Sequence, residues 1–287
     1  MKARVLFGVF GFAFVLLALY VFPPIVLELV VAALCVFATY EVLGSTKLVR
    51  NHLELLLAMA VSLGLAVGHF SILPLRLESV MQGLVLVLLF GSFAIELKYH
   101  DVMKASQVSW AFFGGLAVPY LLLSLLRIFQ MHYHHGSFIV LLPLLAAWGA
   151  DTCALFSGML FGKHKLAPVV SPNKTIEGAV GGVMGSMLLG VVVTACYTAL
   201  HGQLVGVPLD TLGWRYYVVV VLLGGFGSLL GIVGDLFASV IKRQCGIKDY
   251  GTIFPGHGGI MDRFDSVLFI APFVAMVVTA VFYYFTK

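Results

Sequence analysis

Acidic, basic and hydroxyl side chains gather near the carboxy-terminal end of this chain, at the borders of apolar sequence. Asp235 lies inside an apolar run, and Ser239 and Lys242 follow it at spacings of four and three residues, so one helix face carries all three. A loop then leads to Asp262 and Asp265. Magnesium takes hard oxygen ligands, usually one or two carboxylates together with substrate phosphates. Because Asp235 and Asp262 close the two ends of one loop, the sequence predicts that they converge on one magnesium ion.

The same loop is rich in basic residues and glycine. Basic side chains neutralise phosphate oxygens, and glycine lets the backbone approach a ligand closely. The other candidate catalytic and substrate-binding residues of this loop are Arg243, Lys248, His257, Gly258, Gly259 and Arg263. As an alternative, the bases only flank a membrane span and contact anionic lipid headgroups. That alternative leaves the three acids unexplained, since unpaired acids near lipid are costly.

A second polar cluster begins at residue 151 and ends where another helix begins. Thr175 can cap that helix, and Glu177 falls near its first turn. Three lysines precede the positive helix end, an arrangement that suits phosphate oxygens. The candidate substrate-binding residues here are Asp151, Thr152, Lys163, Lys165, Ser171, Lys174, Thr175 and Glu177. The alternative is an ordinary basic loop, and the glycine-lysine-serine turn of a Walker motif is absent.

The elements that must position these residues are membrane helices. Of the 287 residues 61% are hydrophobic and 10% are charged, and the mean hydropathy is +1.06, whereas soluble domains carry about 25% charged residues. Apolar runs of about 20 residues span a bilayer as helices. The predicted fold is therefore all-α and polytopic, with about nine transmembrane helices. The expected spans are 5–22, 24–40, 53–73, 79–97, 107–127, 137–160, 177–199, 216–241 and 265–285.

The first run has the alternative of a signal peptide, because Lys2 and Arg4 precede it. No small-x-small cleavage site closes the run, and Pro23 and Pro24 lead directly into a second apolar stretch. We therefore favour a retained span.

Basic residues are distributed unevenly over the loops of this arrangement. With nine spans, four of the 17 basic residues lie on one side of the membrane and the other 13 lie on the opposite side. Positive residues stay cytosolic, which predicts a cytosolic amino terminus and active site in a multi-pass protein of the inner or plasma membrane. The loop at residues 132–135, with three histidines, is expected to face outward in solvent. The four basic residues on the outward side are Arg76, Arg127, Arg215 and Lys287.

The polar clusters divide the chain into two predicted regions. Residues 1–130 are expected to form an amino-terminal scaffold of about five helices, and residues 131–287 a catalytic region of about four. Acids in the first region lie mainly near span ends, where charge costs least, and are interpreted as structural; they are Glu28, Glu41, Glu54 and Glu96. The four cysteines show no pairing or metal-type spacing and are interpreted as reduced thiols.

Residues 239–265, which read SVIKRQCGIKDYGTIFPGHGGIMDRFD, resemble the signature of phosphatidate cytidylyltransferases, also called CDP-diacylglycerol synthases. The stretch 161–178 is also similar to that family. One departure lies upstream, where the family usually has Asp-Thr-Gly-Ala-Tyr. Here Cys153 replaces the glycine and Leu155 the aromatic residue, while Asp151 and Thr152 are kept.

The resemblance implies an enzyme that converts CTP and phosphatidic acid into CDP-diacylglycerol and pyrophosphate. It implies Mg²⁺ on Asp235 and Asp262, with Asp265 binding a second cation or orienting the ligands. The basic residues of the loop would supply further positive charge. The implied partners are CTP, phosphatidic acid, the bilayer and a second copy of the chain in a homodimer. No nucleic-acid partner is expected.

Two alternatives differ in chemistry. A CTP-dependent lipid kinase would share the spans, the nucleotide and magnesium but transfer the γ-phosphoryl group. A transporter would use intramembrane acids to bind cations, and inverted repeats would favour it. The complete 239–265 signature argues against the kinase, and the sequence shows no convincing internal repeat.

Overall fold

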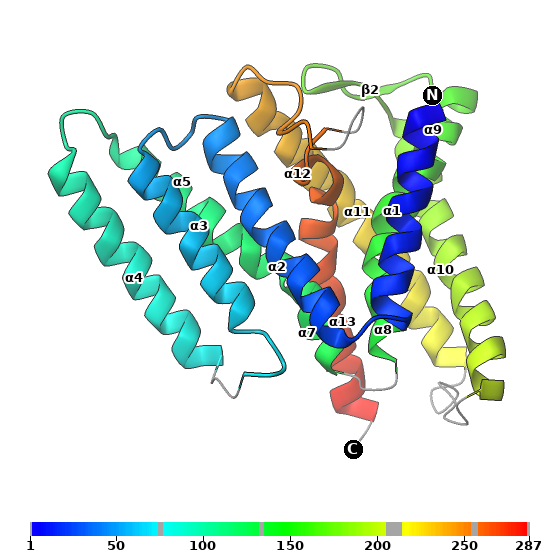
Figure 1. The fold of residues 1–287 in the computed structure, drawn as a ribbon. Helices are drawn as coiled ribbons and strands as arrows, with labels where there is room; N and C mark the ends of the chain where they lie inside the picture. The colour runs from blue at the N-terminus through cyan, green and yellow to red at the C-terminus, as the bar shows by residue number, and fades with distance from the viewer. Residues whose placement is uncertain (1, 74–76, 132–134, 205–213, 254–257, 286–287) are drawn as a thin grey trace. The chain divides into compact units, whose positions relative to one another are not determined.

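The computed structural model describes residues 2–73, 77–131, 135–204, 214–253 and 258–285, and most of them are helical (Figure 1). Seven helices in these ranges are long and apolar enough to cross a membrane. The multi-pass, all-α prediction agrees with this finding. The seven helices are Pro24–Ser45, Leu77–Lys98, Ala105–Met131, Gly136–Phe161, Ile176–Leu200, Trp214–Gln244 and Met261–Val281.

Two of the nine expected spans are not among these seven helices. The expected span 53–73 is the 16-residue helix α3 (His52–Val67), since the chain turns at Gly68. The expected span 5–22 is helix α1 (Lys2–Tyr20), which ends before the Pro23-Pro24 pair. A count of nine spans therefore stays a prediction, whereas the other seven positions match within a few residues.

The chain forms two compact units. The first comprises residues 1–130 and 241–264, and the second comprises 131–240 and 265–287. Residue 130 was also our expected boundary, but the loop that carries Asp262 groups with the amino-terminal helices. The division into a scaffold and a catalytic region stays a prediction.

The first unit is built on helices that lie side by side, as α2, α3 and α4 do in Figure 1. Asn51 begins α3 by accepting the backbone N–H groups of Leu53 and Glu54. The Thr39 hydroxyl donates to the carbonyl of Gly114 at 2.8 Å, which ties α2 to a π-helical turn. The remaining elements are α2 (Pro24–Tyr40), η1 (Glu41–Ser45), α4 (Leu77–Lys98), α5 (Ala105–Phe112), η2 (Phe113–Ala117), α6 (Val118–Leu122), α7 (Ser124–Met131) and α12 (Met261–Phe264).

The second unit consists of helices and one short hairpin. Strands β1 (Lys165–Ala167) and β2 (Ser171–Thr175) pair antiparallel, with Lys165 opposite Thr175. We expected a loop here, because neither strand has the alternating apolar pattern that indicates a strand. The helical elements are α8 (Gly136–Leu144), η3 (Leu145–Gly149), α9 (Ala150–Phe161), α10 (Ile176–Leu204), α11 (Trp214–Gln244, shared with the first unit) and α13 (Val267–Phe285).

Glycines on α10 let it pack closely on α9. A Cβ atom at Gly178 would lie 2.9 Å from the Ala154 carbonyl oxygen, and one at Gly182 would lie 2.8 Å from that of Ala150. A Cβ atom at Gly185 would lie 2.4 Å from the Cys153 sulfur. These small residues therefore serve contacts within one chain.

Candidate active site

The second unit joins its two polar regions through an ion pair between Lys174 and Asp235. Lys174 lies on β2, immediately before α10, and Asp235 lies on α11. The Asp235 side chain is 21% exposed and also accepts a 3.5 Å hydrogen bond from the Ser239 hydroxyl. The expected common face of Asp235 and Ser239 is thereby confirmed. Tertiary folding thus brings a base of one cluster onto an acid of the other.

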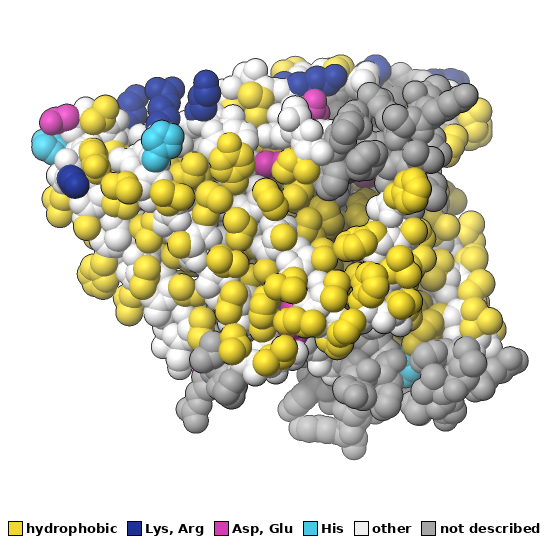
Figure 2. All heavy atoms as spheres, viewed as in Figure 1, with side chains coloured by type: hydrophobic (Ala, Val, Ile, Leu, Met, Phe, Trp, Pro, Cys, Tyr) yellow, Lys and Arg dark blue, Asp and Glu magenta, His cyan; other side chains and the backbone are white. Residues whose placement is uncertain are grey.

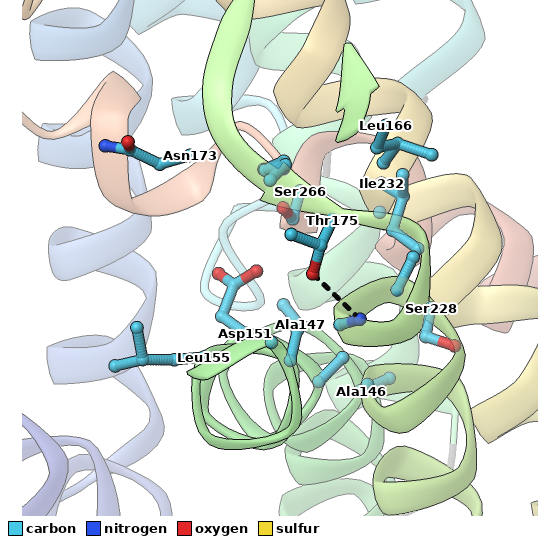
Figure 3. Close-up of a pocket in the computed structure, with 18 of the residues that line it drawn as sticks. Ala146, Ala147, Asp151, Leu155, Leu166, Asn173, Thr175, Ser228, Ile232 and Ser266 are labelled. Atoms are coloured by element: carbon cyan, nitrogen blue, oxygen red, sulfur yellow. Dashed lines mark hydrogen bonds between the residues drawn. The ribbon is translucent and has the colours of Figure 1, made fainter. Parts of the chain in front are cut away.

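Beside this pair lies a cavity of about 460 Å³, lined by η3, α9, the hairpin, α10, α11 and the start of α13. Alanine and glycine form much of its wall, with Leu155, Met159 and Ile232. In Figure 3 the Asp151 carboxylate points from α9 toward the segment that carries Thr175. The polar side chains of the lining are Asp151, Asn173, Lys174, Thr175, Ser228 and Ser266. Asp151, Lys174 and Thr175 were predicted from the sequence.

The other predicted residues of this cluster have structural contacts or face outward. Thr175 accepts the Gly178 N–H at 3.1 Å, which confirms its predicted capping role. Glu177 contacts the His164 ring at 2.6 Å and accepts the Lys163 N–H at 3.1 Å, so its carboxylate holds the turn before β1. Thr152 donates to a backbone carbonyl of its own helix. Lys163 and Lys165 are exposed, and Ser171 is half-buried on β2.

In the first unit Asp262 is the centre of a dense set of contacts. Its Oδ1 forms a 2.8 Å ion pair with the Lys242 ammonium. Its Oδ2 accepts hydrogen bonds from the backbone N–H groups of Tyr250 at 2.8 Å and Gly259 at 2.9 Å. The carboxylate is only 4% exposed and the Lys242 side chain 10%. The Lys242 ammonium also lies 5.3 Å from the centre of the Tyr250 ring. The Asp262 carboxylate thus accepts one side-chain and two backbone hydrogen bonds.

A glycine is required at position 258 beside this carboxylate. Gly258 has φ +81°, and a Cβ atom there would lie 2.7 Å from Asp262 Oδ2. The backbone at Gly258 and Gly259 therefore lies directly on the Asp262 carboxylate, and its predicted approach to a ligand stays a prediction. His257 lies outside the described residues, as do residues 132–134 of the expected outward loop.

The remaining predicted bases are on the surface of the first unit. Arg243, Lys248 and Arg263 are all exposed, and Arg243 donates to the Ile247 carbonyl at 3.2 Å. Asp265 is buried in the second unit, where its Oδ1 accepts the Ser266 N–H at 2.7 Å. Asp265 therefore lies buried two residues before the start of α13.

The donor chemistry fits a hard cation. Asp235 and Asp262 each form an ion pair with a lysine ammonium through their carboxylate oxygens. A positive charge is therefore favourable next to each carboxylate. Within the described ranges, no three His, Cys, Asp or Glu side chains come together as a metal-holding group. Substrate phosphates and water would have to complete the coordination, as is usual for magnesium.

Sequence reasoning missed Glu41. Its carboxylate accepts the N–H groups of Ile260 and Met261, directly before Asp262. In the sequence it is one of several acids at the end of an apolar run, and no local pattern separates it from the others. Only tertiary contact distinguishes it.

The second unit thus holds an acid–base pair beside a largely apolar cavity, and the first unit holds a second, less exposed acid–base pair at Asp262. The chain belongs to the cytidylyltransferase family, whose model matches residues 2–281. It is similar to proteins named phosphatidate cytidylyltransferase: that of Haemophilus influenzae is 30% identical, over 99% of both chains. That of Staphylococcus aureus is 35% identical over 90% of this chain and 94% of its own.

The likeness to other relatives is confined to part of the chain. The phosphatidate cytidylyltransferase of Staphylococcus saprophyticus is 36% identical over 175 residues, which are 60% of this chain and 62% of the relative. In that comparison the chain spans less than two thirds of the relative's length.

Proposed function

We propose that this protein is a phosphatidate cytidylyltransferase, which transfers CMP from CTP to phosphatidic acid. The observation that carries the proposal is Asp262, a carboxylate held by Lys242 and two backbone amides inside the 239–265 segment. The family match and the names of the full-length relatives point to the same activity. The fold supports it as well, because a membrane-embedded site gives access to a lipid substrate.

In the proposed reaction a phosphate oxygen of phosphatidic acid attacks the α-phosphorus of CTP. A new P–O bond forms, the bond from the α-phosphorus to the bridging oxygen breaks, and pyrophosphate leaves with the electron pair. Such transfers depend on positioning and charge neutralisation more than on proton transfer. No strong general base is required, because the attacking phosphate is already ionised at neutral pH.

The charged residues divide into two roles. Asp262 and Asp235 are the proposed magnesium ligands, and Asp265 is proposed to bind a second cation or to orient them. A bound magnesium ion would supply positive charge to the phosphate oxygens. Each carboxylate has its own lysine: Lys242 pairs with Asp262 in the first unit, and Lys174 pairs with Asp235 in the second. Arg243, Lys248 and Arg263 are exposed, which suits them to attract the CTP triphosphate from water.

The cavity of the second unit is the proposed place for phosphatidic acid. Its alanine and glycine walls are apolar and suit the diacylglycerol part, whereas Lys174 at its lining offers a positive charge to the phosphate. Asp151 and Thr175 add polar atoms. Cytosolic placement of the site is proposed because CTP arrives from water.

The exposed bases of the first unit support this orientation. Lys47 and Arg50 follow η1, Lys98 ends α4, and Lys104 directly precedes α5. Figure 2 shows dark blue side chains along the edge where these loops lie, above a broad yellow band. Basic residues at one end of apolar helices are typical of a cytosolic face.

Product analysis tests the proposed function. Purified protein in mixed micelles is given cytidine-labelled CTP together with either phosphatidic acid or a lipid alcohol, and the products are separated. CDP-diacylglycerol with one pyrophosphate for each turnover is the expected result. CDP with a phosphorylated lipid alcohol would establish the kinase, and the absence of CTP turnover with every lipid would leave the transporter.

A further inference from the structure

Glu41 is a buried acid far from the signature in sequence. It begins η1 at the end of the long apolar helix Pro24–Ser45, and it is 1% exposed. Its Oε1 accepts the Ile260 N–H at 3.0 Å, and its Oε2 accepts the Met261 N–H at 2.7 Å. These contacts join positions 219 and 220 residues apart. Both oxygens of the Glu41 carboxylate therefore accept hydrogen bonds from the backbone immediately before Asp262.

Consecutive amides of this loop are shared between two carboxylates. The Gly259 N–H donates to Asp262, and the next two N–H groups donate to Glu41. A rotation of this backbone that broke the Glu41 contacts would also move the Gly259 N–H and the Cα atom of Asp262. The orientation of Asp262 is thus coupled to Glu41 through three neighbouring peptide groups.

Two glycines allow the loop backbone to lie directly on Glu41. A Cβ atom at Gly251 would lie 2.3 Å from Glu41 Oε1, and one at Gly259 would lie equally close. Gly251 follows Tyr250, whose N–H donates to Asp262. Both sides of the loop therefore pack on Glu41, and neither place has room for a side chain.

We propose that Glu41 is a positioning residue for the transfer site: it fixes residues 258–261 so that Asp262 faces Lys242 with its metal-binding oxygens in place. The proposal rests on the proposed function only in its activity readout. Glu41 does not touch the reacting atoms, and its effect passes through the backbone of the loop. Loss of such an outer partner typically lowers metal affinity or activity 10- to 100-fold.

The chain offers a closely matched control in Glu28. Glu28 lies on the same apolar helix, is 0% exposed, and accepts the Ser71 N–H at 3.0 Å. Its contacts hold a loop that carries no proposed site residue. In Glu41→Gln the NH₂ group replaces an oxygen that accepts a backbone N–H, whichever oxygen it replaces. In Glu28→Gln the NH₂ group can replace Oε2, which has no hydrogen-bond partner, so the contact with Ser71 is kept. General effects of changing a buried acid in this helix are thus common to both variants.

The test measures CTP turnover as a function of magnesium concentration, together with amide hydrogen exchange of a peptide covering residues 258–264. We expect Glu41→Gln to lower kcat by about 10- to 100-fold, to raise the magnesium concentration for half-maximal rate, and to speed exchange at Ile260 and Met261. Glu28→Gln should change neither quantity more than about twofold. A merely structural role for Glu41 would lower the amount of folded protein and leave the magnesium requirement of the folded fraction unchanged.

Gly251→Ala serves where Glu41→Gln fails to fold, since it keeps the carboxylate and disturbs only its contact with the loop. It should raise the magnesium requirement in the same direction. The proposal is overturned if either folded variant keeps the wild-type magnesium requirement and slow exchange at Ile260 and Met261. Should wild-type protein show no CTP turnover, the proposed function fails, and the exchange measurement alone decides whether Glu41 holds the loop.

Discussion

Asp262 and Lys242 form the least exposed ion pair among the proposed site residues, and the charge of each side chain is compensated by the other. Breaking a buried pair leaves one charge without compensation, which costs about 3 to 5 kcal/mol. With 4% and 10% exposure, these side chains approach that situation. Function and stability are therefore joined at Asp262, as they are not at an exposed site residue such as Arg263.

We predict that Asp262→Asn lowers CTP turnover at least about 100-fold, because the amide keeps the size of the side chain but removes the charge that holds a hard cation. Its melting temperature should also fall, since Lys242 loses its partner. Asp249→Asn is the matched control: Asp249 is an exposed acid of the same loop, and its loss should be mild. Near-normal turnover of Asp262→Asn with an unchanged magnesium requirement would place the metal on other residues.

A second prediction separates the two effects. The double variant Lys242→Met, Asp262→Asn removes both charges and should melt at a higher temperature than Asp262→Asn alone, while remaining inactive. Thermal unfolding in detergent measures the difference. Equal melting temperatures for the two variants would show that Lys242 is not left uncompensated when Asp262 is neutralised.

Asp235 gives a third prediction. Asp235→Asn should reduce turnover about as strongly as Asp262→Asn, and raised magnesium should partly restore its rate, because Asp262 is still present. The rate is measured over a magnesium titration. A rate that stays low at every magnesium concentration would mean that Asp235 does more than bind the ion, for example by holding Lys174.

Among the elements, α9 and α10 explain how an unusual residue is accommodated. Cys153 stands where the resembling family usually has glycine, and its sulfur lies opposite Gly185, where a Cβ atom would approach to 2.4 Å. The Cys153 side chain on α9 therefore fills the space that the absence of a side chain at Gly185 leaves on α10. Asp151, two residues before Cys153, is carried by the same helix and lines the cavity.

This contact leads to a prediction about volume. Cys153→Gly should keep activity within a few-fold, whereas Cys153→Leu should lower activity and stability, because overpacking usually costs 1 to 3 kcal/mol. Gly185→Ala should have a milder effect of the same kind, and Cys153→Gly should relieve it. Activity and melting temperature of these variants, together with Cys153→Ser, provide the test. Inactive Cys153→Gly beside active Cys153→Ser would indicate a polar role for the thiol.

The elements also show what sequence could predict. Long apolar runs located seven helices within a few residues, since lipid leaves few alternatives to a helix. The hairpin at residues 165–175 was missed because its short polar strands lack a periodic pattern. At the site, residue types identified Asp262 and Lys242 as candidates, whereas their pairing and the role of Glu41 arise from contacts between distant segments, which local patterns do not encode.

At the scale of the whole molecule, orientation in the membrane is the main untested prediction. Single cysteines at positions 104, 135 and 248, in a background with the native cysteines replaced by alanine, are treated with an impermeant maleimide in intact cells. Position 135 should be labelled, and positions 104 and 248 only after the cells are opened. Labelling of position 248 in intact cells would reverse the topology and place the site outside.

The contact between Glu41 and the loop at residues 260–261 also has a consequence for biosynthesis. A ribosome completes the helix that carries Glu41 more than two hundred residues before it reaches the amides that this carboxylate accepts. Until then the growing chain holds a carboxylate at the membrane without its final partners, a costly state. Polypeptides released before residue 260 should therefore be degraded faster than polypeptides released after residue 264, because only the longer ones can supply the N–H groups that Glu41 accepts.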